Sequence, residues 1–188
     1  MKSTACRRAF LKSSLYFMAT ILSAKPALAR HWVDRARLPE GRLTLHNINN
    51  NERLTVTYRN EMGVYDSEAL QALNWALRCH ASNETTNMDL QVIEYLHRLD
   101  QALGGGNEIK IISGYRSPSY NSKLRSVSQG VAKHSLHTKG KAIDLAIAGI
   151  GLDTIRCTAK SFSAGGVGYY PKGGFVHIDS GAFRTWIG

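Results

Sequence analysis

The first 29 residues contain no aspartate or glutamate, although they carry five of the chain's 24 lysines and arginines. Their apolar run, which includes residues 15–22, is about ten residues long, whereas a membrane-spanning helix needs about 20. No cysteine follows this run closely enough to indicate a lipoprotein. The short run argues against an N-terminal membrane anchor or a buried helix, and the missing cysteine argues against a lipid anchor.

The motifs that this segment does contain indicate export. Arg7-Arg8 precedes the apolar run, and Ala27-Leu28-Ala29 supplies the small residues of a cleavage site. Together they predict a signal peptide of the twin-arginine pathway over residues 1–29. We therefore expect one mature domain over residues 30–188, located in the periplasm and without a transmembrane segment.

Internal repeats, low-complexity tracts and the signatures of helix-turn-helix, zinc-finger or ribonucleoprotein domains are also lacking. The formal charge is +10, and removing residues 1–29 leaves 19 basic against 14 acidic residues, or +5. Such a balance attracts polyanions, and outside the cytoplasm the expected polyanion is the cell wall. Nucleic acid is the alternative, but export and the missing motifs exclude it. About 159 mature residues suffice for one domain with a real core, which we expect to be a monomer.

Cysteine is scarce. Of the three cysteines, Cys6 belongs to the predicted signal peptide, which leaves Cys79 and Cys157. An oxidising compartment permits a disulfide between them. The alternative is two buried free thiols, and the spacing in the sequence does not decide between the two arrangements.

Hydrophobic periodicity predicts a chain of mixed helices and strands with an N-terminal β-hairpin. We expect an α+β fold in which helices flank a central antiparallel sheet, the arrangement implied by the resemblance described below. Alternating segments on either side of Asn49-Asn50-Asn51 predict that hairpin. Apolar spacing typical of helices begins near Ser67, with Asp66 or Ser67 as the cap, and again near Asp89. Further strands are expected over residues 108–113, 142–148, 167–170 and 175–179, and further helices over 120–127 and 152–163.

Two of these strands carry residue types that commonly bind metal ions in proteins. In residues 142–147 Asp144 lies between two alanines on one face, while isoleucines and a leucine take the other face. His177 alternates in the same way with Val176 and Ile178. If the two strands are neighbours, Asp144 and His177 share a face, and His137 on the preceding loop can complete a triangle. Two histidines, a carboxylate and an open fourth position are typical of a catalytic zinc site. The alternative is a surface carboxylate with ordinary polar histidines.

Hydrolysis at such a site needs a cation near the developing oxyanion and a proton acceptor. Arg116 is presented on a loop between Gly114 and Pro118, and is a candidate for stabilising the oxyanion or binding a substrate carboxylate. The alternative is a solvated loop arginine. Asp179 is the first candidate for the base, although it could equally orient a ligand histidine. His134 is the second candidate, unless it is only a loop histidine.

Four motifs resemble the murein endopeptidase K family, exported relatives of the zinc D-Ala-D-Ala peptidases with the hedgehog/DD-peptidase fold. They occupy residues 113–117, 135–144, 165–171 and 175–181, and the similarity extends over nearly the whole chain. The resemblance implies zinc ligation by His137, Asp144 and His177, with Arg116 in the substrate site. It also implies cleavage of peptide cross-links between peptidoglycan stem peptides. The expected bonds involve meso-diaminopimelate and include 3-3 links and 4-3 links.

One position departs from the wider superfamily. Many of its members carry a glutamate or aspartate three residues before the last histidine ligand, whereas this chain has Gly174. Either another group accepts the proton of the catalytic water, or that water is activated in a different way. Two alternatives to an endopeptidase therefore stay open. One is a D,D- or L,D-carboxypeptidase, and the other is a zinc-stabilised wall-binding module without catalysis.

Overall fold

The computed structural model describes residues 39–128 and 130–188. The predicted signal peptide, residues 1–29, lies outside the described residues, as do the first residues of the predicted mature domain. Among the residues that the structure describes, no helix is long and apolar enough to cross a bilayer.

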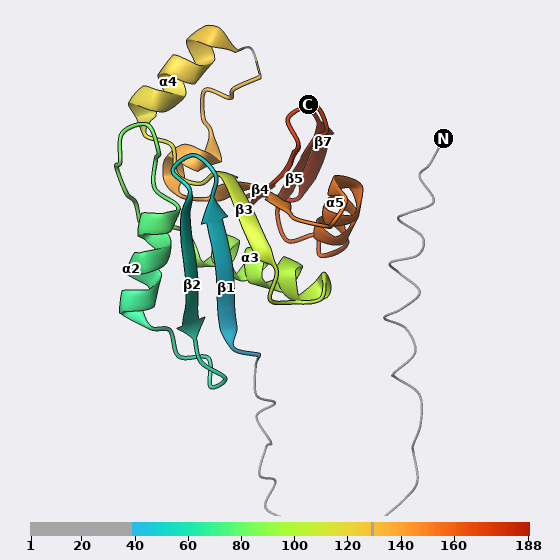
Figure 1. The fold of residues 1–188 in the computed structure, drawn as a ribbon. Helices are drawn as coiled ribbons and strands as arrows, with labels where there is room; N and C mark the ends of the chain where they lie inside the picture. Colours follow the sequence, from blue (N-terminus) through green and yellow to red (C-terminus); the bar gives the residue numbers. More distant parts are fainter. Residues whose placement is uncertain (1–38, 129) are drawn as a thin grey trace, which may run out of the picture.

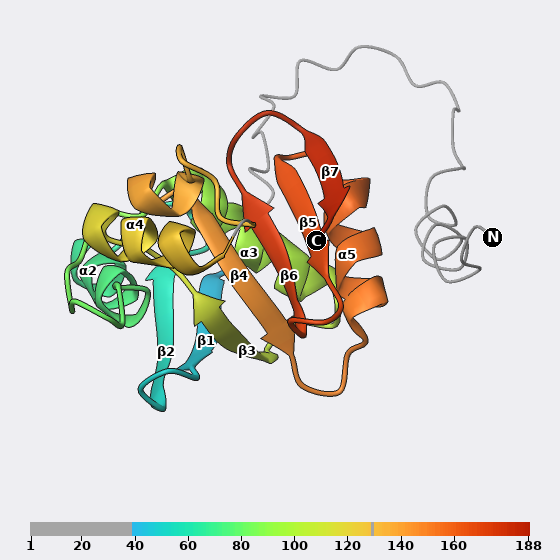
Figure 2. The same cartoon turned by 90° about the horizontal axis from the view of Figure 1, so that it is seen from above.

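Seven strands form one sheet in the order β2-β1-β3-β4-β6-β5-β7, with β4 in the middle. The strands are β1 (Gly41–Asn47), β2 (Glu52–Arg59), β3 (Glu108–Ser113), β4 (Ala142–Ile147), β5 (Gly166–Tyr170), β6 (Phe175–Asp179) and β7 (Arg184–Ile187). The N-terminal hairpin, β1 with β2, is confirmed. Figure 2 shows the sheet from above, with β4 and β6 crossing its centre.

The central strands β3, β4, β6 and β5 are antiparallel neighbours, as expected. The sheet as a whole is mixed, because β1 pairs with β3, and β5 with β7, in parallel. Two helices separate β2 from β3 in the chain. A connection of this length lets β3 run in the same direction as β1, which a tight turn does not allow. The strand β7 has only four residues, too few to show a periodicity, and was not predicted. The fold class is nevertheless α+β, as expected.

Residues 39–128 and 130–188 contain four α-helices: α2 (Ser67–Ala76), α3 (Leu90–Ala102), α4 (Pro118–Val127) and α5 (Leu152–Ser161). Asp66 caps α2 by accepting hydrogen bonds from the backbone N–H groups of Glu68 and Ala69. Helix α4 begins two residues earlier than predicted, since Pro118 suits the first turn of a helix and Ser117 caps it. In Figure 1, α4 lies at one end of the molecule, beyond the sheet.

Helices α3 and α5 pack on the sheet and on each other. The Tyr95 hydroxyl of α3 donates to the Ala159 carbonyl of α5 over 2.9 Å. Their apolar side chains share one core with Ile109 and Ile111 of β3, the isoleucines and leucine of β4, and the valine and isoleucine of β6, all of which are buried. The predicted core side of β4, with Ile143, Leu145 and Ile147, is therefore confirmed.

The two cysteines of the predicted mature domain do not form a disulfide with each other. Cys79 is a buried free thiol whose Sγ lies 3.7 Å from the Ser117 Oγ. Cys79 follows α2, which packs on the edge strand β2, whereas Cys157 lies on α5 beside β5 and β6. Figure 1 shows these two helices on opposite sides of the molecule, so the expected option of a Cys79–Cys157 bond is excluded by distance.

Candidate metal centre and active-site cleft

Neighbouring strands bring Asp144 and His177 together. β4 and β6 are antiparallel, and Asp144 is the direct cross-strand partner of His177. Cross-strand partners place their side chains on one face of a sheet, and the Nδ1 of His177 lies 2.8 Å from the Oδ1 of Asp144. The predicted shared face is therefore confirmed, although it is buried rather than exposed to solvent.

A short 3-10 helix, η1 (Leu136–Lys139), supplies His137. The helix ends at Gly140, whose φ of 64° is in the left-handed region that favours glycine. A Cβ atom at this position would also lie 2.8 Å from the Thr86 side chain. This tight ending turns the chain directly into β4. The Nε2 of His137 then lies 3.2 Å from the Asp144 Oδ1 and 3.2 Å from the His177 Nδ1.

Each histidine is oriented by a hydrogen bond from its other ring nitrogen. The Nδ1 of His137 donates to the Gly114 carbonyl over 2.7 Å, and the Nε2 of His177 donates to the Asp179 Oδ2 over 3.0 Å. These bonds leave the lone pairs of His137 Nε2 and His177 Nδ1 directed at Asp144. One ligand atom from each of the three residues lies within 4.8 Å of the others. Such a set, with its histidines fixed from behind, could hold a divalent metal ion.

Burial and the neighbouring groups shift the pKa values of all three residues in this cluster. Burial opposes ionisation of Asp144, but His137 and His177 hold the pKa of its carboxyl well below the ordinary value. Burial lowers the pKa of His137. Burial would also lower the pKa of His177, but the protonated ring donates to both Asp144 and Asp179, and these two bonds outweigh burial and raise that pKa. Asp144 is therefore ionised, and its negative charge faces the ring nitrogens of His137 and His177.

Asp179 is saturated with hydrogen bonds and does not line the cleft. Its Oδ1 accepts from the backbone N–H groups of Gly166 (3.0 Å) and Gly181 (2.8 Å) and from Arg184, and its Oδ2 accepts from His177 and Arg184. The residue has no exposed surface. Burial opposes its ionisation, but the bonds from His177 and Arg184 keep its pKa well below the ordinary value. These contacts leave Asp179 no free access to a water molecule in the cleft.

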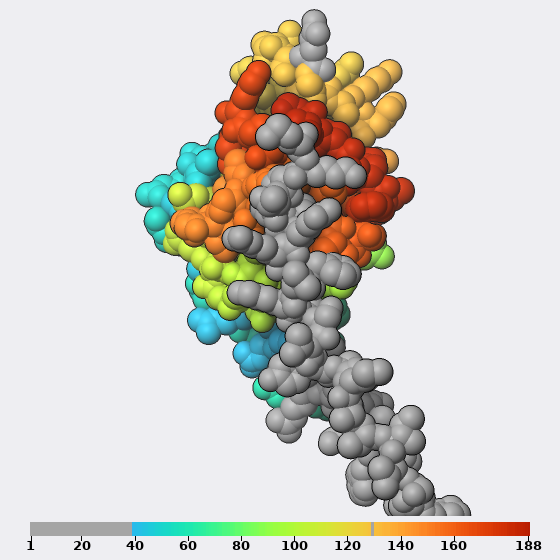
Figure 3. All heavy atoms as spheres, turned by 90° about the vertical axis from the view of Figure 1, so that its right-hand side faces the viewer, coloured from blue at the N-terminus to red at the C-terminus, as the bar shows by residue number. Residues whose placement is uncertain are grey.

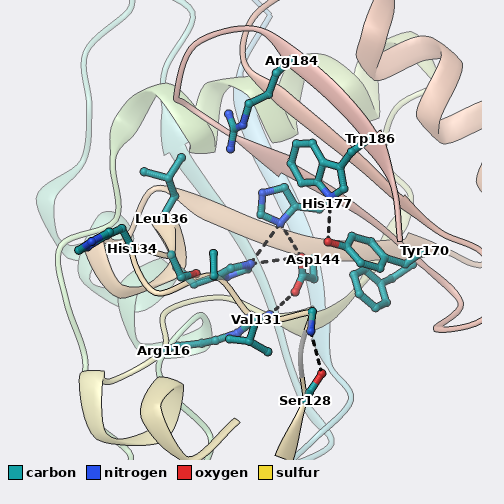
Figure 4. A pocket seen from close by; sticks show the side chains of 15 residues that line it. Arg116, Ser128, Val131, His134, Leu136, Asp144, Tyr170, His177, Arg184 and Trp186 are labelled. Atoms are coloured by element: carbon teal, nitrogen blue, oxygen red, sulfur yellow. Dashed lines mark hydrogen bonds and ion pairs between the residues drawn. The ribbon is translucent and has the colours of Figure 1, made fainter. Parts of the chain in front are cut away.

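Arg116 lies beside the cluster, on the loop between β3 and α4. Its Nη2 donates to the Asp144 Oδ2, and its Nε donates to the Ser113 Oγ over 2.8 Å. Its backbone N–H also donates to the His137 carbonyl over 3.2 Å. The guanidinium is thus held in place at the edge of the cleft rather than solvated on a loose loop (Figure 4).

A cleft of about 350 Å³ opens above the three residues. One wall consists of Tyr170, Phe175 and Trp186, and the loop over residues 130–136 forms the facing side. The rings of Tyr170 and Phe175 stack at 4.5 Å, and the Trp186 Nε1 donates to the Tyr170 hydroxyl oxygen over 2.8 Å. In the space-filling view, α4 projects beyond the C-terminal strands that supply this wall (Figure 3).

Sequence reasoning missed Tyr170, Arg184 and Trp186 as residues of the cleft. Arg184 and Trp186 lie on β7, the strand without a usable periodicity, so only its pairing with β5 brings them to the site. Tyr170 belongs to a quoted motif, but nothing in its spacing distinguishes it from a core aromatic.

His134 is the remaining candidate for the base, and Gly174 occupies the position where a carboxylate was expected. His134 lines the cleft and is exposed, and Figure 4 shows its ring pointing away from Asp144 and His177. Gly174 lies in the turn between β5 and β6 with a φ of 71°, and a Cβ atom there would meet no other atom within 4 Å. The position where the resemblance to the wider superfamily leads one to expect a carboxylate therefore has no side chain here.

Sequence comparison decides the family. The model of a family described as peptidoglycan L,D-endopeptidase MepK matches residues 36–186. The chain belongs to the MepK family. It is 40% identical over 185 residues to peptidoglycan L,D-endopeptidase MepK of Escherichia coli K12, covering 98% of this chain and 99% of the relative. It is also 42% identical over 147 residues to the probable peptidoglycan L,D-endopeptidase MepK of Haemophilus influenzae, covering 78% of each chain.

The MepK relative of Shigella flexneri is likewise 40% identical over 185 residues. No solved structure matches the chain significantly. Membership of the MepK family makes this protein an enzyme of a metallopeptidase family. The predicted resemblance is confirmed.

Proposed function

We propose that this protein is a zinc-dependent peptidoglycan endopeptidase that hydrolyses cross-links between stem peptides. The proposed bonds involve meso-diaminopimelate and include 3-3 links, with 4-3 links as further substrates. The observation that carries the proposal is the convergence of His137 Nε2, Asp144 Oδ1 and His177 Nδ1 at the cleft of a MepK-family chain. A hedgehog/DD-peptidase type of fold goes with this proposal.

Zinc is the proposed metal because the donors are two imidazoles and one carboxylate, a set that suits zinc better than magnesium or calcium. His137, Asp144 and His177 would hold it. When bound, zinc acts as a Lewis acid toward the attacking water and the scissile carbonyl. Asp179 contributes by fixing the ring of His177, so we assign it the orienting role rather than that of the base.

Two arginines supply cationic groups at the cleft, each paired with a buried carboxylate. Arg116 and Arg184 both line it, and Asp144, committed to the cluster, is the only carboxylate among its lining residues that the structure describes. Diaminopimelate carries a free carboxylate next to its cross-linking amine. Arg116 is placed to bind that carboxylate or to stabilise negative charge that develops on the carbonyl oxygen.

Tyr170 supplies a second polar group in the cleft. Since Trp186 donates to its oxygen, the phenol proton of Tyr170 is free to be donated elsewhere, and no acceptor for it lies among the described residues. We propose that this O–H donates to the substrate carbonyl as negative charge develops there. His134 is the proposed proton acceptor, which requires its ring to turn toward the cleft when substrate binds.

The test uses purified cross-linked peptidoglycan with the zinc-loaded mature protein and its His137→Ala variant. Muropeptide dimers and monomers are followed by chromatography and mass spectrometry. Conversion of dimers to monomers by the wild type alone is the expected result, and the masses identify the bond. Release of terminal D-alanine alone would assign the protein as a carboxypeptidase instead.

A wall-binding module without catalysis is the second candidate, and the missing carboxylate at Gly174 favours it. Stoichiometric zinc binding without any turnover would establish that candidate and refute the endopeptidase.

Export to the periplasm by the twin-arginine pathway is part of the proposal, supported by the motifs of residues 1–29. Replacing Arg7-Arg8 by two lysines should leave the protein in the cytoplasmic fraction. Export of this variant at the wild-type level would contradict that route. We also propose that the protein is a monomer, which sedimentation of the mature chain tests.

A further inference from the structure

The last turn of α2 exposes a large aromatic side chain away from the cleft. Trp75 is 53% exposed. It borders a hollow of about 480 Å³ whose other lining residues are Gln71, Asn74, Thr85, Thr86 and Asn87. None of these residues is charged. An exposed indole that borders a hollow offers a flat apolar face with polar groups beside it, which is the composition of many ligand sites.

The indole is held rigid from one side. The guanidinium carbon of Arg78 lies 4.0 Å from the centre of the Trp75 ring. Arg78 is itself buried, and its Nη1 and Nη2 donate to the two carboxylate oxygens of Glu52 over 2.7 and 2.8 Å. Glu52 borders a different hollow beside Trp75. One face of the indole is therefore covered by a fixed cation, and the exposed area belongs to its other face and edges.

Neutral hydrogen-bonding groups surround this exposed face. Asn74 is fixed by accepting from the Met88 backbone N–H over 2.9 Å and by donating to the Asn87 side chain over 3.3 Å. The side chains of Gln71, Thr85 and Thr86 have no hydrogen-bond partner among the described residues. Their amide and hydroxyl groups are free to bind a ligand with several neutral donors and acceptors.

A flat apolar face ringed by neutral amides and hydroxyls matches a sugar ring, which has C–H groups on its faces and hydroxyl or acetamido groups at its edge. The absence of charged lining residues in this hollow contrasts with the arginines of the cleft. An anionic peptide would therefore prefer the cleft, and a neutral N-acetylated sugar would prefer the Trp75 hollow.

Two backbone contacts connect this hollow to the metal centre. The Asp89 N–H, just beyond the hollow, donates to the carbonyl of Gly140, where the helix of His137 ends. At the end of α2, the Leu77 carbonyl accepts from the Tyr115 N–H, next to Arg116. In peptidoglycan the stem peptide is attached covalently to a glycan strand. A stem peptide bound in the cleft therefore holds its glycan strand near the surface of the enzyme.

We propose that Trp75 and the five neutral residues around it form a subsite for an N-acetylated sugar of the glycan strand. This inference rests on the proposed peptidoglycan substrate but concerns a different surface. Its consequence is that the enzyme distinguishes peptides attached to glycan from free cross-linked peptides.

The test compares Trp75→Ala with wild type on two substrates: intact sacculi, and cross-linked peptide dimers freed of glycan by an amidase. The variant should lose roughly tenfold in rate on sacculi, the change that about 1.4 kcal/mol of lost binding gives, and should match the wild type on free dimers. Met62→Ala, which removes another exposed apolar side chain, is the control and should match the wild type on both. Equal rates on sacculi, or equal losses on both substrates, would overturn the proposal.

A binding experiment separates this inference from the proposed activity. In the His137→Ala background, co-sedimentation with sacculi should fall when Trp75 is replaced by alanine. Oligomers of N-acetylglucosamine should compete with the sacculi when Trp75 is present. Binding that depends on Trp75 but is not competed by these sugars would refute a glycan subsite. Glycan binding by a wild type that cuts no cross-link would refute the endopeptidase and leave the subsite standing.

Discussion

Replacing Asp179 by asparagine separates its two candidate roles. The substitution keeps the size of the side chain but gives it one acceptor oxygen and one N–H₂ group. In the wild type, Oδ1 accepts from two backbone N–H groups and Arg184, while Oδ2 accepts from His177 and Arg184. Whichever way the amide turns, its N–H₂ group faces other hydrogen-bond donors, and the bonds that those donors made to the carboxylate are lost. If it faces His177, that ring loses the acceptor that directs its Nδ1 at the metal.

The magnitude follows from the role of the bond. Removing an acceptor behind a metal-binding histidine weakens metal affinity about 10- to 100-fold, or roughly 1.4–2.7 kcal/mol. The mismatch at a fully buried position should also lower the free energy of unfolding by about 1–3 kcal/mol. Zinc affinity is measured by competition with a chromophoric chelator, and stability by chemical denaturation of the zinc-free protein.

Asp66→Asn is the matched control, because asparagine caps a helix about as well as aspartate and α2 lies away from the site. It should change neither quantity by a measurable amount. The result that would refute our reasoning is specific. If Asp179→Asn binds zinc as tightly as the wild type but loses most of its turnover, then Asp179 acts on a proton and not on His177.

Three further predictions concern the cleft and the ion pair between Arg78 and Glu52, whose guanidinium lies against the Trp75 ring. Tyr170→Phe should lower kcat about 100-fold with little change in KM, and an unchanged kcat would remove the phenol from the proposed mechanism. Zinc affinity should fall as the pH drops below the raised pKa of His177, because the ion competes with a proton that this residue holds more tightly than an ordinary histidine; chelator competition between about pH 8 and 5 measures this, and a flat profile would contradict it. A hydrogen bond from Arg78 lowers the pKa of Glu52 below 4.5, so the stability that ionised Glu52 contributes is present above pH 4.5 and is lost as the pH falls through its folded-state pKa. Glu52→Gln should therefore lower Tm at neutral pH, and the difference from wild type should shrink in acid; a difference that persists in acid would contradict the ion pair.

The sequence was sufficient for the parts of the site that obey strand alternation. Small and apolar neighbours place Asp144 and His177 on definite sides of their strands, and one cross-strand pairing then joins them. Helix starts were equally local, since Asp66 and Asp89 each cap the turn that follows them. Such features depend on a few adjacent residues.

Features that depend on distant pairing were missed. The parallel partners of β1 and β5, and the arrival of Trp186 beside Tyr170, follow from how whole segments pack. The role of Asp179 could not be separated from that of a base, because its partners Gly166 and Arg184 come from two other strands. In each case the missing information was which segments become neighbours, not the chemistry of the residue.

The position of His137 on a single short helical turn has a consequence for the lifetime of the protein. Asp144 and His177 are built into the middle of the sheet, whereas η1 follows a loop that borders the cleft. An ion bound by all three residues would link that turn to β4 and β6. A ligand that binds only the folded state stabilises it by an amount that grows with the logarithm of the ligand concentration, so the bound ion would stabilise this turn. Zinc supply would then govern how readily proteases cut the loop over residues 130–136. Scarcity of zinc would then lower the amount of the enzyme, through proteolysis, as well as its activity.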